Sequence, residues 1–199
     1  PMEGADNERV FTLRNIPDTY KIRGYVEEQH PKSAVVVGGG YIGVEMAENL
    51  KNAGVDVTIV ELADHVIAPL DYDMACDVHR YLKEKGVGLI LQNGVQSIRE
   101  EDGALRLSDG EIDTDLVIMA VGVRPDTALA KEAGLELNRR GAIVVDEHML
   151  TSDPDIYAVG DAVEVTDFVT GEKAYPAGWP RQQAGPHCCG QHLRYSHYL

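Results

Sequence analysis

Three glycines at fixed spacing, with an acidic residue about 20 positions later, are the part of this sequence most able to do chemistry. The glycines are Gly38, Gly40 and Gly43 in the segment GGGYIGVE, and the acid is Glu61. In a strand–turn–helix unit the first glycine permits a tight turn and the second lets the backbone approach a pyrophosphate. The third lets the helix pack closely on the strand. The free N–H groups and positive dipole end of such a helix favour a phosphate, so the pattern predicts a dinucleotide site.

Glu61 indicates which dinucleotide would bind. A carboxylate at the end of the second strand accepts a hydrogen bond from a ribose 2′-hydroxyl and repels a 2′-phosphate. No Lys or Arg stands in the next four residues, 62–65, to hold such a phosphate. The sequence therefore favours NAD(H) over NADP(H).

The elements around the glycines fit that interpretation better than an ordinary glycine-rich turn. Residues 34–37 form an apolar β-branched run typical of a buried parallel strand. A helix follows, and residues 57–60 predict the next strand. The expected apolar face of the helix is Ile42, Met46, Leu50 and Ala53, and Gly54 ends it.

The first 30 residues predict a strand at 10–13 and a helix over 20–29. Asp18 or Thr19 is the expected helix cap, and His30-Pro31 ends the helix. The polar opening segment 1–8 begins without Met, so we expect the chain to be part of a longer protein.

After Glu61 the pattern predicts a helix over 73–85 and a third parallel strand over 87–91. The expected apolar face of this helix is Met74, Val78, Tyr81 and Leu82. His65 and His79 could act as ligands or bases, but a lone histidine is more often a surface or packing residue, and no cluster at metal spacing accompanies them.

Short alternating segments then replace the long runs. Segments 96–99, 104–107 and 111–112 predict an antiparallel meander with turns at 101–103 and 108–110. Residues 115–121 return as a buried strand, which Gly122 and the following residues through Pro125 end.

A second module follows this strand. It predicts a helix at 129–133, a strand at 143–145 and another strand within 151–161 that ends in Gly160-Asp161. The module is too short to own a core, so we expect it to complete a domain whose other half is absent.

Composition limits the partners. The formal net charge of −15 argues against nucleic acid or an anionic membrane. No apolar run approaches the roughly 20 residues of a membrane span and no signal peptide opens the chain, so a cytoplasmic location is expected. Cys76, Cys188 and Cys189 form neither a disulfide framework nor a C-x-x-C pair.

The glycine turn, the exit AVGVRP and the segment TSDPDIYAVGDA together resemble the FAD-dependent pyridine nucleotide-disulfide oxidoreductases. Within that family the chain is most similar to the NADH oxidase, NADH peroxidase and coenzyme A-disulfide reductase group, for which VFTLRNIPDT is also typical. The resemblance implies an α/β fold, with a Rossmann-like parallel sheet, an inserted antiparallel meander and an incomplete FAD-type half-domain.

The resemblance also implies a division of the chain. Residues 1–30 would be a connecting strand and helix of the FAD domain, and residues 31–122 the NAD(H) domain. Residues 123–173 would be the C-terminal part of the FAD domain, and residues 174–199 an aberrant tail.

Site residues follow from the same resemblance. Gly38, Gly40, Ile42, Gly43 and Glu61 would bind NAD(H), with Gly122 near the nicotinamide half. Tyr41 would stack over the flavin where nicotinamide enters, and Glu45 would lie near nicotinamide and flavin. In the second module Gly160 and Asp161 would bind the FAD ribitol, and Ala162 would begin a helix that meets the FAD pyrophosphate.

The departures from the family pattern are equally informative. The family's first G-x-G-x-x-G and its redox cysteine lie upstream of the NAD domain and are not in this sequence. No cysteine here is therefore expected to be catalytic, and no metal is expected.

In the segment YPAGWPRQQAGPHCCGQH, from Tyr175, the apolar residues show neither the spacing of a helix nor that of a strand. With suitable synonymous codons and a one-base shift it reads IPLAGPANRQGRIAADN, which resembles the family segment after the Gly-Asp motif. We hypothesise a slipped reading frame, which the coding DNA would test. The alternative is a metal site at His187, Cys188, Cys189 and His192, although adjacent cysteines rarely reach one tetrahedral centre.

Two functions remain open. The parent would pass hydride from NADH to FAD and then to oxygen, peroxide or a disulfide, with a dimerisation domain and a FAD half-domain that are missing here. Alternatively, the chain is an inactive NAD(H)-binding module. Homo-oligomers are expected, since an incomplete half-domain leaves apolar surface exposed.

Overall fold

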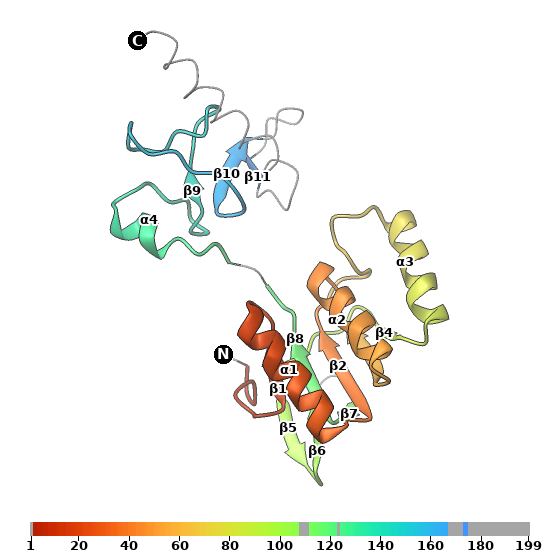
Figure 1. Ribbon diagram of the computed structural model, residues 1–199. Coiled ribbons are helices and arrows are strands. Elements are labelled where there is room, and N and C mark those ends of the chain that lie inside the picture. Colours follow the sequence, from red (N-terminus) through yellow and green to blue (C-terminus); the bar gives the residue numbers. More distant parts are fainter. Residues whose placement is uncertain (1, 108–111, 123, 167–172, 175–199) are drawn as a thin grey trace. The chain divides into compact units, whose positions relative to one another are not determined.

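The computed structural model describes residues 2–107, 112–122, 124–166 and 173–174. The chain forms two compact units, Pro1–Gly122 and Val123–Leu199. Figure 1 labels the helices and strands of both. No helix in the described ranges is long and apolar enough to cross a membrane.

The first unit is built on a five-stranded parallel sheet in the order β1-β8-β2-β3-β4. Its strands are β1 (Val10–Thr12), β2 (Ser33–Val37), β3 (Asp56–Val60), β4 (Gly88–Ile90) and β8 (Leu116–Met119). From β2 the chain moves outward through β3 to β4 and then returns to β8 on the other side of β2. The direction of progression therefore reverses between β2 and β8. Ligands of open parallel sheets bind outside the carboxyl ends of the strands at such a switch point.

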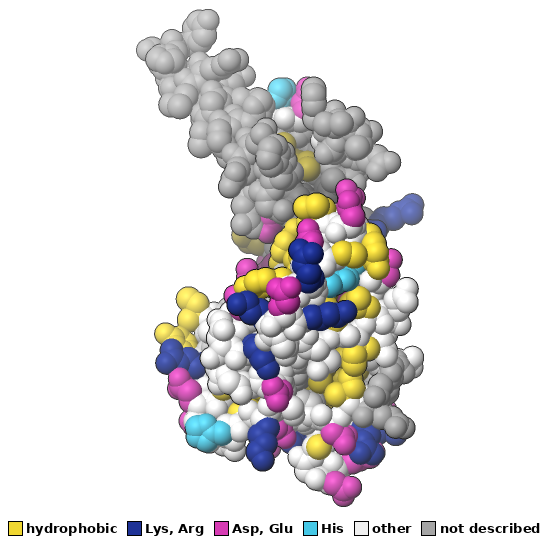
Figure 2. Space-filling view, turned by 90° about the vertical axis from the view of Figure 1, so that its right-hand side faces the viewer, with side chains coloured by type: hydrophobic (Ala, Val, Ile, Leu, Met, Phe, Trp, Pro, Cys, Tyr) yellow, Lys and Arg dark blue, Asp and Glu magenta, His cyan; other side chains and the backbone are white. Residues whose placement is uncertain are grey.

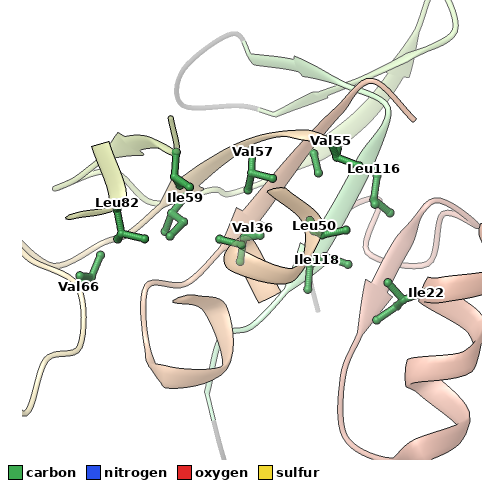
Figure 3. Close-up of a cluster of buried hydrophobic side chains, with 13 residues drawn as sticks. Ile22, Val36, Leu50, Val55, Val57, Ile59, Val66, Leu82, Leu116 and Ile118 are labelled. Atoms are coloured by element: carbon green, nitrogen blue, oxygen red, sulfur yellow. The ribbon is translucent and has the colours of Figure 1, made fainter. Parts of the chain in front are cut away.

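Helices cover one face of this sheet. They are α1 (Ile16–Gln29), α2 (Tyr41–Asn52) and α3 (Tyr72–Glu84). Ile22 of α1, Leu50 of α2 and Leu82 of α3 belong to one buried cluster with Val36 and Ile59 of the sheet (Figure 3). The helices are thus held by a common apolar core, which fixes where each begins relative to the strand ends.

The opposite face of the sheet packs on an antiparallel meander. Its strands are β5 (Ile98–Glu101), β6 (Ala104–Leu107) and β7 (Ile112–Thr114). Val35 and Val37 point to this side and share a second buried cluster with Leu105 and Leu107. Alternate residues of β2 therefore serve two cores, as the pleat of a strand requires. The Rossmann-like sheet and the inserted meander are both confirmed.

The second unit is smaller. It contains α4 (Ala128–Glu132), β9 (Ile143–Val144), β10 (Val163–Thr166) and β11 (Lys173–Ala174). Strand β10 pairs in parallel with β9 and antiparallel with β11. The assignment of this unit and of residues 1–30 to a FAD domain stays a prediction. Residues 10–12 and 16–29 contribute β1 and α1 to the first unit.

The start of α1 was predicted wrongly. The helix begins at Ile16 rather than Tyr20, and its cap is Asn15 instead of Asp18 or Thr19. The Asn15 side-chain oxygen accepts a hydrogen bond from the Asp18 N–H at 2.9 Å. A proline near the first helical position, which the sequence reasoning passed over, favours this earlier start.

The predicted apolar faces were wrong in part. Ile42 and Ala53 are exposed, and Ala47 is fully buried in α2 instead. In α3, Met74 and Tyr81 are more than half exposed, whereas Ala75 is fully buried. An alanine thus occupies part of the buried stripe in both helices, and in α2 it packs in the core cluster of the sheet, so counting large apolar residues misplaced the stripe.

The meander turn at 101–103 is confirmed, with Asp102 and Gly103 both at positive φ. The turn at 108–110 lies outside the described residues. The strand expected within 151–161 is wrong, because only an isolated bridge joins Leu150 and Tyr157 there. Thr151 accounts for this difference, since its N–H and hydroxyl both donate to the Ile156 carbonyl and fold the segment back.

Candidate dinucleotide site

The glycine turn lies directly after β2 and is fixed by backbone contacts. Gly38 has φ +104°, and a Cβ there would stand 2.6 Å from the Ala120 carbonyl oxygen. A Cβ at Gly43 would stand 1.9 Å from the Gly38 carbonyl oxygen. Any side chain at either position would force the turn away from β8 or α2 away from the turn. These contacts confirm the tight turn and the close helix packing expected for the first and third glycines.

Gly40 faces open space. It is exposed, and a Cβ added to it would meet nothing within 4 Å. Gly40 is also the N-cap of α2 and supplies no side-chain acceptor to the first turn. The first N–H groups of a helix have no intrahelical partner, so this end can donate to an external anion.

Glu61 is held by the same turn. Its Oε2 accepts a hydrogen bond from the Gly39 N–H at 2.5 Å, and its Oε1 accepts one from the Ala63 N–H at 2.8 Å. A carboxylate offers about four lone-pair sites, so two remain for other donors. The carboxylate is therefore oriented in advance and still able to accept hydroxyl donors.

The carboxyl end of β8 completes the switch point. The Ala120 N–H donates to the Val37 carbonyl at 2.8 Å. Beyond it, Val121 is 53% exposed and Gly122 has φ +73°. The predicted residue Gly122 therefore lies at the end of the strand that neighbours the glycine turn.

Tyr41, Ile42 and Glu45 lie on the first turns of α2. All three are exposed, Tyr41 by 53% and Ile42 by 39%. Tyr41 and Glu45 are four residues apart, so they share one side of the helix. The structure thus groups them beside the glycine turn, and their roles stay predictions.

The sequence reasoning missed the loop that supports this site, residues 61–70. Val66 is fully buried, and its Cγ1 would stand 2.9 Å from a Cβ placed on Gly39. The Ile67 N–H donates to the Gly39 carbonyl at 2.7 Å. His79 of α3 accepts the Val66 N–H through Nε2 at 3.2 Å, which makes it a packing residue. The available sequence signal was the apolar pair Val66-Ile67, which follows the polar residues Asp64 and His65.

The predicted FAD residues lie in the second unit. Gly160 has φ +99°, and Asp161 is exposed. Ala162 was expected to begin a helix, and this is wrong, because β10 begins at Val163. The Ala162 carbonyl accepts the Ile143 N–H at 2.8 Å, so pairing with β9 extends the backbone here.

The part of the chain that the structure describes contains no group of three or more His, Cys, Asp and Glu side chains that could hold a metal ion. Cys76 is exposed on α3. The alternative metal site at residues 187–192 and the tail from Tyr175 onward lie outside the described residues.

Comparison with known proteins identifies relatives. The profile of the family described as pyridine nucleotide-disulphide oxidoreductase matches residues 1–182. The chain is 47% identical over 176 residues to an NADH oxidase of Methanocaldococcus jannaschii, covering 87% of this chain and 39% of that protein.

Two solved structures are also similar. Reduced Bacillus anthracis CoADR-RHD matches with a TM-score of 0.85 and 46% identity, over 96% of this chain and 35% of that one. The water-forming NADH oxidase of Lactobacillus brevis bound to NADH matches with a TM-score of 0.83 and 31% identity, over 97% of this chain and 43% of that one. The chain thus spans about two fifths of the length of these relatives.

Proposed function

Because the chain belongs to the pyridine nucleotide-disulphide oxidoreductase family, we propose that it is the NAD(H)-binding portion of a flavoenzyme similar to NADH oxidases and coenzyme A-disulfide reductases. The parent enzyme would take hydride from NADH onto FAD and pass electrons to oxygen, peroxide or a disulfide. The relatives support the class of reaction, and the residues of the first unit support the nucleotide.

The observation that best supports this proposal is the hydrogen bond from the Gly39 N–H to the Glu61 carboxylate, at the switch point of the sheet. In this position its free lone pairs would accept the ribose hydroxyls of NADH, while Gly40 and the N-terminus of α2 would receive the pyrophosphate. The 2′-phosphate of NADPH would meet the carboxylate charge. Preference for NADH over NADPH follows from that repulsion.

Exposed apolar side chains gather after the carboxyl ends of β1, β2 and β8, which are neighbours in the sheet. They are Ile16, Tyr20, Tyr41, Ile42 and Val121. Exposure of several neighbouring apolar side chains to water is unfavourable. A nicotinamide ring and a flavin-bearing domain would cover them. In that arrangement Tyr41 would gate the nicotinamide pocket, Glu45 would set its local electrostatics, and Gly122 would border it.

The FAD residues fit less well. Gly160 and Asp161 would hold the ribitol in the parent, but the strand after Ala162 provides no helix N-terminus for a pyrophosphate. FAD is therefore proposed for the parent enzyme, in which a further FAD half-domain and a dimerisation domain would accompany these residues. The chain by itself is not proposed to hold it.

A second function has its own support. Gly38, Glu61 and the N-terminus of α2 all lie within the first unit, and Cys76 of that unit is exposed on α3. A stand-alone NAD(H)-binding module without catalysis would need only these nucleotide-binding features. Retained yellow flavin that NADH bleaches would favour the enzyme, and a colourless protein that binds NADH would favour the module.

The test is a fluorescence titration of the purified chain with NADH and with NADPH, alongside its visible absorption spectrum. Tighter binding of NADH, by about ten-fold or more, is expected from the charge of Glu61. Equal affinity for the two nucleotides would contradict the assigned role of Glu61. Failure to bind either would refute the dinucleotide site in this chain.

Self-association is a further expectation for this chain. The exposed apolar residues at the carboxyl edge of the first unit would drive contacts between copies. Sedimentation velocity at rising protein concentration should show a concentration-dependent increase in mass. A strictly monomeric profile at high concentration would contradict it.

A further inference from the structure

His65 lies between two hydrogen-bond acceptors in the loop 61–70. Its Nδ1 is 2.5 Å from Asp64 Oδ1, and its Nε2 is 3.1 Å from the Leu70 carbonyl oxygen. A carboxylate and a carbonyl only accept, so both contacts are hydrogen bonds only when both ring nitrogens carry protons. The geometry therefore fits the charged imidazolium form of His65, whose side chain is 16% exposed.

His79 has the opposite requirement. Its Nε2 accepts the Val66 N–H, so that nitrogen must be unprotonated and the ring neutral. Val66 and Ile67 in turn support Gly39, whose N–H holds Glu61. Both histidines thus make hydrogen bonds that hold the loop 61–70, His65 in its charged form and His79 in its neutral form.

We propose that His65 is a positioning residue for the dinucleotide site, and that its protonation state sets the affinity of that site for NAD(H). This rests on the function proposed above. The charged ring ties the start of the loop at Asp64 to its end at Leu70. Loss of one proton breaks one of the two ties and loosens the support of Gly39 and Glu61.

The surroundings of His65 favour its charge. From its own loop it faces Asp64, and from α3 it faces the Tyr72 ring, edge-on at 5.9 Å, and His79. The hydrogen bond to Asp64 raises the pKa of His65 above its ordinary value of 6.5. Figure 2 shows the α3 side of the first unit, where histidine, basic and hydrophobic side chains lie next to one another.

The environment of His79 acts in the other direction. Burial lowers the pKa of His79 below 6.5, and the charges of Lys83 and His65 lower it further. The contribution of His65 is complete below pH 6.5 and is lost as pH rises through its raised pKa. The contribution of His79 is complete above pH 6.5 and is lost as pH falls through its lowered pKa. Between the lowered pKa of His79 and the raised pKa of His65, the hydrogen bonds of both histidines are present together.

The test measures the NADH dissociation constant by fluorescence from about pH 6 to about pH 9, across the range in which a histidine of raised pKa titrates. Wild-type affinity should weaken by about five-fold as pH rises through the His65 pKa, which corresponds to one lost hydrogen bond. His65→Gln should bind NADH with the weaker affinity at every pH, so its profile should lack this loss of affinity at alkaline pH, the alkaline limb. Asp64→Asn should move the limb to lower pH, and the control His148→Gln, in the second unit, should keep the wild-type profile.

A measurement on the wild-type chain tests the proposal even if these variants fail to fold. By linkage, NADH must raise the pKa of the His65 imidazole, which NMR titration follows through its ring proton. NADH that binds without moving this pKa, or a His65→Gln profile that keeps the wild-type limb, would overturn the proposal. Absence of NADH binding at every pH would instead overturn the proposed function.

Discussion

Two glycine turns, one in each unit, were both predicted to lead into a helix, and they differ in structure. Gly38 follows β2 and leads through Gly40 into α2. Gly160 is followed by Asp161 and by Ala162, which was predicted to open a helix. The chain instead continues from Ala162 into the strand β10. The first turn therefore presents a helix N-terminus, and the second presents only a strand.

The neighbours of each turn explain the difference. Around Gly38 and Gly43, carbonyl oxygens stand close enough to exclude any Cβ, and Glu61 holds the Gly39 N–H. A Cβ at Gly160 meets nothing within 4 Å. Residues at the ends of β3 and β8 fix the first turn, whereas the second continues directly into β10, which pairs with β9. A glycine motif predicts a nucleotide site only where neighbouring elements complete it.

The sharpest test of this comparison replaces one glycine in each turn. Gly43→Ala should destabilise the first unit by about 3 kcal/mol and abolish NADH binding, because the new methyl overlaps the Gly38 carbonyl. Gly160→Ala should cost about 1 kcal/mol, from positive φ alone. Urea denaturation followed by circular dichroism measures both. Equal losses would mean that the two turns are fixed to the same degree.

The next test removes the acid that completes the first turn. Glu61→Ala should weaken NADH binding by about 2 kcal/mol, or roughly thirty-fold, since two ribose hydroxyls lose their acceptor. NADPH binding should weaken less, because the repulsion disappears as well. Asp161→Ala, the matched acid of the second unit, should leave both affinities unchanged. An equal loss from both variants would contradict the assignment of NAD(H) to the first turn.

The sequence was a good guide wherever one local pattern decides the structure. The strand before Gly38, the helix after it and Glu61 at the next strand end were all predictable from spacing and alternation. The second turn was not, because pairing with β9 decides whether Ala162 opens a helix or a strand. The support from Val66 and His79 depends on long-range packing onto Gly39, and the apolar pair Val66-Ile67 alone does not predict that contact.

The smallest test concerns two helix starts within the first unit. Helix α1 satisfies its own N-terminus through Asn15, whereas α2 begins at Gly40, whose cap has no side-chain acceptor. Asn15→Ala should lower the free energy of unfolding by about 1 kcal/mol and leave NADH affinity unchanged. Gly24→Ala, in open space within α1, should be neutral or slightly stabilising and serves as the control. Weaker NADH binding by the Asn15 variant would show that the nucleotide also depends on α1, and the N-terminus of α2 would then not be the only helix end that serves the site.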